Sequence, residues 1–184
     1  SEFYENHAKD AGAIEISGKN NLIYKSTFED NVADQDGGAV HIALNYLYPD
    51  NQRNNTIRTS KFNNNKANRY GGAIRVSSEG NVIDSSKFYY NGAQIGGAVS
   101  LNANNNYINH SNFEHNHASE GGAVNLNSEN LVINNSYMNF NNATYGGALY
   151  VNYFAHNAVV NNTNFVQNDA FGYGGAIYWS GSND

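Results

Sequence analysis

The sequence of 184 residues contains no cysteine, one proline and one tryptophan. Disulfides therefore contribute nothing to its stability, and the absence of cysteine by itself does not indicate a compartment. Only 14% of the residues are charged and the formal net charge is −6, so the basic surface that nucleic-acid binding requires is missing. No apolar run of about 18 residues and no charged-then-apolar leader occurs, so we expect no membrane insertion by this segment.

Asparagine is abundant, with 36 residues, and it recurs in phase with other residues. The skeleton Ser-x-Phe-x-x-Asn-x-Ala, followed after two or three residues by Gly-Gly-Ala and an aliphatic residue, returns along the whole chain. Successive Phe positions are 25, 34, 26, 25, 25 and 27 residues apart. A period this short indicates a solenoid, because disordered chains do not keep such a register. The Phe position is filled by Phe3, Phe28, Phe62, Phe88, Phe113, Met138 and Phe165, and the Asn position by Asn6, Asn31, Asn65, Asn91, Asn116, Asn141 and Asn168.

Each repeat predicts three short strands. One follows Gly-Gly, as in Ala73–Val76, the second carries an isoleucine such as Ile83, and the third carries the Phe position. Alternation of period two in runs of a few residues, separated by Gly and Asn turns, favours strands over helices. We therefore predict an all-β fold, a single-stranded right-handed parallel β-helix of about six to seven coils of ~25 residues. Residues 1–184 would form one domain, which we expect to be a segment of a longer protein.

The repeated residues are expected to stack into columns. The Phe column should form the hydrophobic spine, with the aliphatic residues after Gly-Gly beside it and the residue between them, such as Arg75, facing out. The Asn position is expected at a turn, because asparagine tolerates a left-handed φ. If its side chain points inward, each amide can bond those of the coils above and below. The glycine pair predicts a bend where a Cβ would clash or φ is positive.

Two coils are longer than the others, and both insertions fall at the same turn, between the first and second strands. The insertions cover residues 45–54 and 152–157 and are rich in aromatic residues. Insertions in solenoids often lie on the binding side, although a loop this short is also typical of a neutral insertion. We predict a shallow trough between them, with a small set of ligand-binding side chains: Tyr46, Tyr48, Asp50, Arg53, Asn104, Tyr153 and Phe154.

Phe-x-x-Asn followed in phase by Gly-Gly-Ala and an aliphatic residue resembles the repeat of the polymorphic outer membrane proteins, secreted adhesins described in chlamydiae. It stands here as Phe62–Asn65 with Gly71–Ile74. The asparagine-rich, cysteine-free coils look more like the adhesin-like surface proteins of methanogenic archaea, which share this repeat. Met138 in the Phe position and Ala11 in a glycine position depart from the pattern. The resemblance implies a surface-anchored stalk or passenger that serves in adhesion.

An enzyme is the alternative from another class, because parallel β-helices also host lyases, hydrolases and epimerases that act on carbohydrates. Such sites need clustered carboxylates with a basic partner or Ca²⁺, whereas the acidic residues here are scattered. Asp34 and Asp36 are weak candidates for a calcium site, against a solvated turn as the simpler interpretation. The six histidines have no partner at metal-ligand spacing. We therefore expect no catalytic residues, no cofactor and no metal.

Three functions remain open. The first is a cell-surface adhesin segment that attaches to a glycan or protein of another cell, and the second is a passive stalk that displays another domain. The third is a carbohydrate-active β-helix. Outward tyrosines such as Tyr89, Tyr90, Tyr150 and Tyr178 favour the first, because they offer flat apolar area and hydrogen bonds at low entropic cost. We expect an extracellular location, with the anchor in parts of the protein outside this chain.

Overall fold

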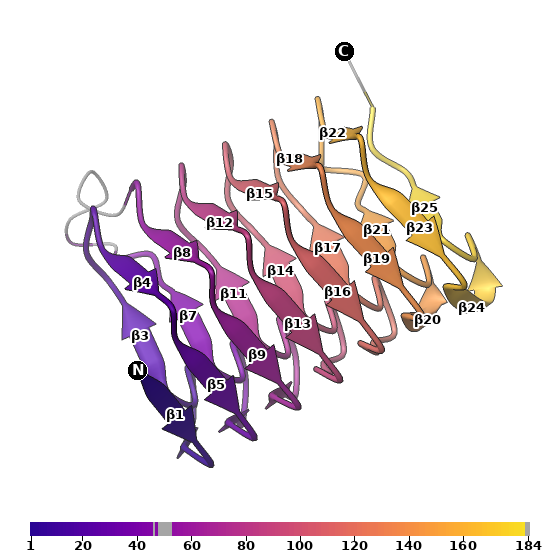
Figure 1. Cartoon of the computed structure of the whole chain (residues 1–184). Helices are drawn as coiled ribbons and strands as arrows, with labels where there is room; N and C mark the ends of the chain where they lie inside the picture. The colour runs from indigo at the N-terminus through magenta and orange to yellow at the C-terminus, as the bar shows by residue number, and fades with distance from the viewer. Residues whose placement is uncertain (46, 48–52, 183–184) are drawn as a thin grey trace.

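The structure is a computed structural model that describes residues 1–45, 47 and 53–182, and its regular structure there consists of β-strands alone. The chain winds through successive coils whose strands lie side by side in parallel sheets (Figure 1). The predicted all-β parallel β-helix is confirmed, with about seven turns. The described residues include no helix of the length and apolar character needed to cross a membrane.

Three long sheets run along the axis, as predicted from the three strands of each repeat. Sheet A contains the Phe position: β1 (Glu2–Tyr4), β5 (Thr27–Glu29), β9 (Lys61–Asn63), β13 (Lys87–Tyr89), β16 (Asn112–Glu114), β19 (Tyr137–Asn139) and β23 (Asn164–Val166). Sheet C follows Gly-Gly: β3 (Ile14–Ile16), β7 (Val40–Ile42), β11 (Ile74–Val76), β14 (Val99–Leu101), β17 (Val124–Leu126), β21 (Leu149–Val151) and β25 (Ile177–Trp179). Sheet D comes next: β4 (Leu22–Tyr24), β8 (Thr56–Arg58), β12 (Val82–Asp84), β15 (Tyr107–Asn109), β18 (Val132–Asn134) and β22 (Val159–Asn161).

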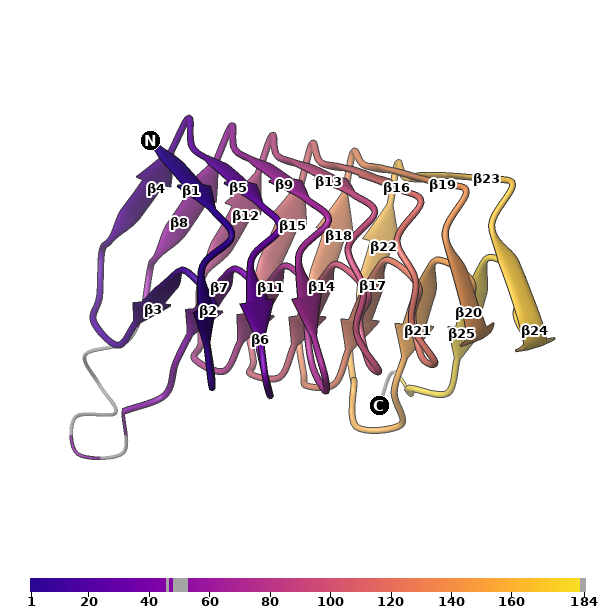
Figure 2. The same ribbon diagram turned by 90° about the horizontal axis from the view of Figure 1, so that it is seen from below.

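A fourth, shorter ladder lies between sheets A and C and is not predicted by the sequence pattern. We call it sheet B. It pairs strands at the two ends of the molecule, and single parallel bridges such as Gly92 to His117 continue it through the middle coils. Its strands are β2 (His7–Ala8), β6 (Val32–Ala33), β10 (Lys66–Ala67), β20 (Asn142–Tyr145) and β24 (Asp169–Tyr173). Figure 2 shows this ladder along the edge of the coils opposite sheet D.

The repeat positions stack in register. Phe28 pairs with Phe3 on one side and with Phe62 on the other. Ile23 pairs with Ile57 although 34 residues separate them, so the insertion at 45–54 does not shift the register of sheet D. The five phenylalanines from Phe3 to Phe113 form one stack of nearly parallel rings, with centroids 4.6–4.9 Å apart. Met138 continues this column and is also fully buried.

The Asn column is an inward amide ladder through all seven repeats. In the middle coils, the Asn116 Oδ1 accepts from both the backbone N–H and the Nδ2 of Asn91. The Asn116 Nδ2 donates to the Oδ1 of Asn141 and to the Phe88 carbonyl. The same pattern runs from Asn6 to Asn168, so the side chains do point inward and each amide bonds those of the adjacent coils. Each buried amide is fully paired, which avoids the cost of about 1–3 kcal/mol for an unpaired buried polar group.

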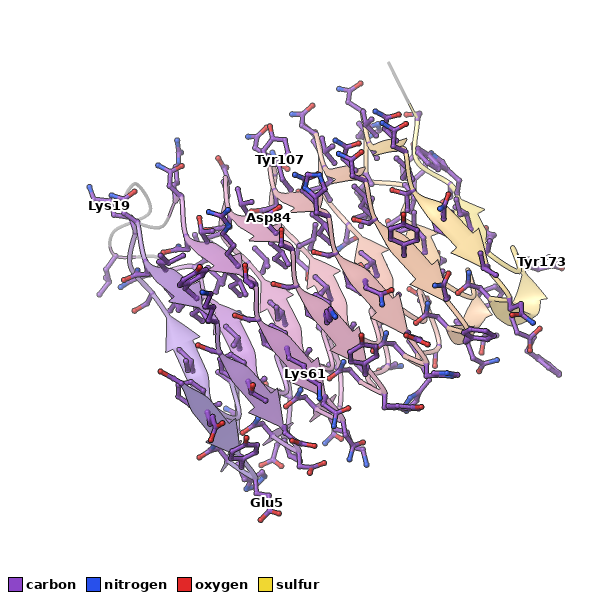
Figure 3. The ribbon with its side chains drawn as sticks, in the orientation of Figure 1. Glu5, Lys19, Lys61, Asp84, Tyr107 and Tyr173 are labelled. Carbon is purple, nitrogen blue, oxygen red and sulfur yellow. The ribbon has the colours of Figure 1, made fainter. Side chains whose placement is uncertain are left out.

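The left-handed residue at this corner is the one before the asparagine, so the expectation that the asparagine itself has a positive φ is wrong. The chain must turn first, and only then can the amide point into the coil. The residues at this position, which we call the outer corner, are Glu5, Asp30, Asn64, Tyr90, His115, Phe140 and Gln167, with φ between 51° and 57°. Glu5, labelled in Figure 3, points away from the coil at the first of these positions.

Two further polar columns support the corners on either side of sheet D. At the corner between sheets D and A, each serine hydroxyl accepts from the backbone N–H of the preceding coil's serine, as Ser111 does from Ser86. The same hydroxyl donates to the carbonyl two residues earlier. At the turn between sheets C and D, a second amide ladder, which the sequence pattern did not reveal, joins Asn21, Asn55, Asn81 and Asn106. In the last two coils Leu131 and Ala158 replace it.

The glycine pair is required for both of the predicted reasons. Gly71 has a φ of 63°, a conformation that glycine adopts without steric cost. A Cβ on Gly72 would lie 2.1 Å from the carbonyl oxygen of Gly97 in the next coil, and such an approach is excluded. The coils can therefore stack this closely only with glycine at the second position.

Candidate functional site

The two insertions leave the coil at the predicted turn, between sheets C and D. The first joins β7 to β8 and the second joins β21 to β22, with three coils between them. The second loop extends beyond the shorter turns of the preceding coils (Figure 2). Tyr46, Tyr48 and Asp50 lie outside the described residues.

The remaining predicted ligand-binding residues are partly engaged within the protein. Arg53 pairs with Glu79 at 3.6 Å. The Asn104 Oδ1 accepts from the Glu129 backbone N–H at 3.0 Å and from the Ser128 hydroxyl. Tyr153 and Phe154 are 64% and 63% exposed and pack edge to face. None of the hollows identified on the described surface is lined by Asn104, Tyr153 or Phe154, so the trough stays a prediction.

A row of stacked rings stands at the outer corner of three adjacent coils. The His115 ring lies 5.0 Å from the Tyr90 ring and 5.1 Å from the Phe140 ring, and the three planes are nearly parallel. Tyr90 is 55% exposed and Phe140 is 41% exposed. We call these three residues the corner aromatic row. It presents ring edges and a continuous apolar strip to solvent on one side of the solenoid.

The corner aromatic row occupies a backbone position that is unfavourable for such residues. A left-handed φ costs an ordinary L-residue about 1–2 kcal/mol, and asparagine, aspartate and glycine tolerate it best. The preceding coils have Asp30 and Asn64 at this position. The coil therefore closes without a ring, and the aromatic side chains at the next three corners are not required by the fold.

The two metal-site candidates do not converge on a common point. Asp34 extends to His7 at 2.8 Å on the exposed edge. Asp36 is 2% exposed and its carboxylate is bound by the guanidinium groups of Arg69 and Arg75. Both of its oxygens accept from these arginines, which leaves Asp36 as an internal ion pair. Among the described residues, no group of three His, Cys, Asp or Glu side chains is placed to hold a metal ion.

Two segments of the chain, 25–43 and 59–77, match the model of the Chlamydia polymorphic membrane protein repeat. Each matched segment runs from the corner before sheet A to the end of a sheet C strand. No curated protein and no solved structure matches the chain. The match supports the resemblance to the polymorphic membrane protein repeat, but gives no support for the likeness to archaeal adhesins. In general terms it supports a surface-exposed, adhesin-like β-helical segment and gives no support for an enzyme.

Proposed function

We propose that this chain is the lateral contact segment of a cell-surface adhesin, which attaches to a glycan or protein of another cell. It would be held at the surface by parts of the protein outside this chain. The repeat match supports the surface location, and the rigid, polar-laddered coils suit a module that must display side chains at fixed spacing.

The corner aromatic row is the observation on which the proposal depends. Tyr90, His115 and Phe140 are exposed, stacked and placed at left-handed positions where asparagine or aspartate would be less strained. Backbone strain retained at a surface site is often associated with function. Exposed aromatic rings on a rigid frame are also typical of protein and glycan contact surfaces. A passive stalk would have no use for this row, and the repeat match gives no support for an enzyme.

The test uses the double variant Tyr90→Asn/Phe140→Asn. Asparagine tolerates the left-handed φ better, so the melting temperature should stay the same or rise. Attachment of target cells to immobilised protein should fall by about tenfold or more if the row is the contact surface. When the melting temperature of the variant is equal to or above that of the parent, loss of attachment cannot be attributed to unfolding.

A matched control is Tyr107→Asn, which removes an exposed tyrosine on the outer face of sheet D (Figure 3). Attachment should be unchanged in this control. Equal attachment by the parent, the double variant and a variant lacking both insertions would support the passive stalk instead.

A further inference from the structure

The outer face of sheet C is the floor of a groove that runs along the solenoid axis. Its outward side chains stack in register in the order Arg75, Ser100, Asn125 and Tyr150. One wall is the parallel bridge column before Gly-Gly, which includes Ile95 and Glu120. The other wall is the column just after the sheet C strands, and it includes Asn102, Asn127 and Asn152.

The groove contains two hollows. The larger, of about 370 Å³, is lined by His41, Arg75 and the buried Asp36 among others. The smaller, of about 180 Å³, is lined by Tyr70, Ile95, Glu120, Asn125, Asn127 and Asn152. The floor residues Ser100 and Asn125 face out of the core as the alternation predicts, yet they are 0% and 1% exposed because the walls cover them.

Asn125 provides the evidence for a ligand. Its side chain is 1% exposed, lines the smaller hollow, and its Oδ1 has no hydrogen-bond partner among the described residues. An unpaired buried acceptor costs about 1–3 kcal/mol, so such a group calls for an external donor. Asn112, Asn134 and Asn139 also have a buried unpaired Oδ1, but they lie on strands of sheets A and D and line none of the identified hollows.

The chemistry around Asn125 favours a neutral donor over an anion. The hollow is lined by one carboxylate, Glu120, by amides, and by tyrosine, without a lysine or arginine. Burial raises the pKa of Glu120 above its ordinary value, as expected for a carboxylate without a cationic partner. Carboxylate and amide oxygens accept hydrogen bonds from hydroxyl groups.

Tyr150 lies next to Asn125 on the groove floor. Its ring stacks on Tyr178 at 5.0 Å, so the opposite ring face is directed back along the axis toward the coil of Asn125. An aromatic face beside polar acceptors matches the alternating apolar and hydroxylated surfaces of a sugar ring.

We propose that this groove is a binding site for a neutral oligosaccharide that lies along the solenoid axis, with Glu120 and Asn125 accepting hydrogen bonds from its hydroxyl groups. The coils from β7 to β21 give the groove a length of about 19 Å at ~4.8 Å per coil, enough for several sugar units. A peptide is disfavoured because the interior strands of sheet C are already paired on both sides, and strand addition requires a free edge. The site lies on a different face from the corner aromatic row and does not depend on the function proposed above.

The test is binding of the 184-residue chain to immobilised neutral hexasaccharides of glucose, mannose, galactose and xylose, beside an acidic oligogalacturonate. We expect at least one neutral series to bind and the acidic one not to bind. Asn125→Leu should weaken that binding by about tenfold, as loss of a buried hydrogen bond does, and Glu120→Gln should weaken it as well. The matched control Asn139→Leu should bind like the parent.

Amide chemical-shift mapping with the bound hexasaccharide keeps the test decisive if Asn125→Leu does not fold. Shifts should cluster at Ser100, Asn125 and Asn127. The proposal is overturned if no neutral series binds, if the acidic oligosaccharide binds instead, or if shifts and affinities do not involve Asn125. Cell attachment through the corner aromatic row would be unaffected by these outcomes, so the two proposals can fail separately.

Discussion

Two turns of the coil are held by ladders of buried asparagine side chains, and the two ladders differ in how far they continue along the chain. At the corner between sheets A and B, the Phe-x-x-Asn-x-Ala spacing is constant and the amide ladder runs unbroken from Asn6 to Asn168. At the turn between sheets C and D, the ladder spans only four coils and then gives way to Leu131 and Ala158. Both insertions occur at this second turn. The corner between sheets A and B therefore holds the coils together, whereas the turn between sheets C and D tolerates changes in length and chemistry.

The largest loss of stability should come from replacing a ladder asparagine at the corner between sheets A and B. The same replacement at the turn between sheets C and D should cost less. Asn116→Leu removes an amide whose four side-chain bonds pair with Asn91, Asn141 and the Phe88 carbonyl. We expect a loss of about 4 kcal/mol or more in the free energy of unfolding. Denaturant titration would measure it.

Asn106→Leu is the matched change at the tolerant turn. Asn106 also makes four side-chain hydrogen bonds, two accepted from Asn81 and two donated to the Ser78 and Ala103 carbonyls. The loss should still be smaller, because Asn81 Nδ2 keeps its bond to the Ser78 carbonyl and the new side chain would lie beside the buried Leu131. The expected loss is about 1–2 kcal/mol. Equal losses at the two turns would remove the distinction between them.

Substitutions in the Phe column should lower the free energy of unfolding almost as much as those at the corner between sheets A and B. Phe113 is fully buried and stacks on Phe88 at 4.6 Å, so Phe113→Ala should cost about 3–5 kcal/mol in unfolding free energy. Met138→Phe extends the ring stack by one coil and should change stability by less than about 1.5 kcal/mol. A loss below about 1 kcal/mol for Phe113→Ala would contradict a close-packed column.

A smaller effect on stability is expected when pH changes the protonation of His41, which lines the groove on sheet C. Burial lowers the pKa of His41, while Glu15 and Asp10 partly oppose this shift. The folded state therefore favours the neutral ring, so His41 contributes stability above its ordinary pKa of about 6.5 that is lost as pH falls toward its folded value. The melting temperature should decrease between about pH 7 and pH 5, and His41→Gln should reduce that decrease. If the melting temperature of His41→Gln falls by the same amount, a group other than His41 causes the decrease.

The columns could be predicted from the sequence because each requires one residue type at one spacing. Phe, Asn and Gly-Gly recur often enough to be recognised despite Met138. The second amide ladder was missed because it has only four members, and the insertion at 45–54 separates Asn21 from Asn55. Sheet B was missed because three of its five strands have only two residues and the middle coils contribute single bridges, which leave no alternating pattern.

The surface was less predictable than the core. The aromatic residue Tyr90 was expected to face outward and does, but its left-handed φ was assigned to the following asparagine. The burial of Asn125 depends on walls contributed by residues distant in sequence, which a single-repeat pattern does not contain. Three of the predicted insertion residues lie outside the described part of the chain, so their role is still a prediction.

Each repeat forms one coil in register, and sheet D keeps its pairing across the longer coil that contains residues 45–54. The absence of cysteine allows a direct test. Leu22 and Thr56 are Cα partners across the first insertion, so Leu22→Cys/Thr56→Cys places two cysteines about 4.8 Å apart, within the range for a disulfide. Intact-mass measurement after mild oxidation should show the loss of two hydrogen atoms from the monomer, and the offset pair Leu22→Cys/Arg58→Cys should keep free thiols. Free thiols in the first pair with a disulfide in the second would contradict the register and the account built on it.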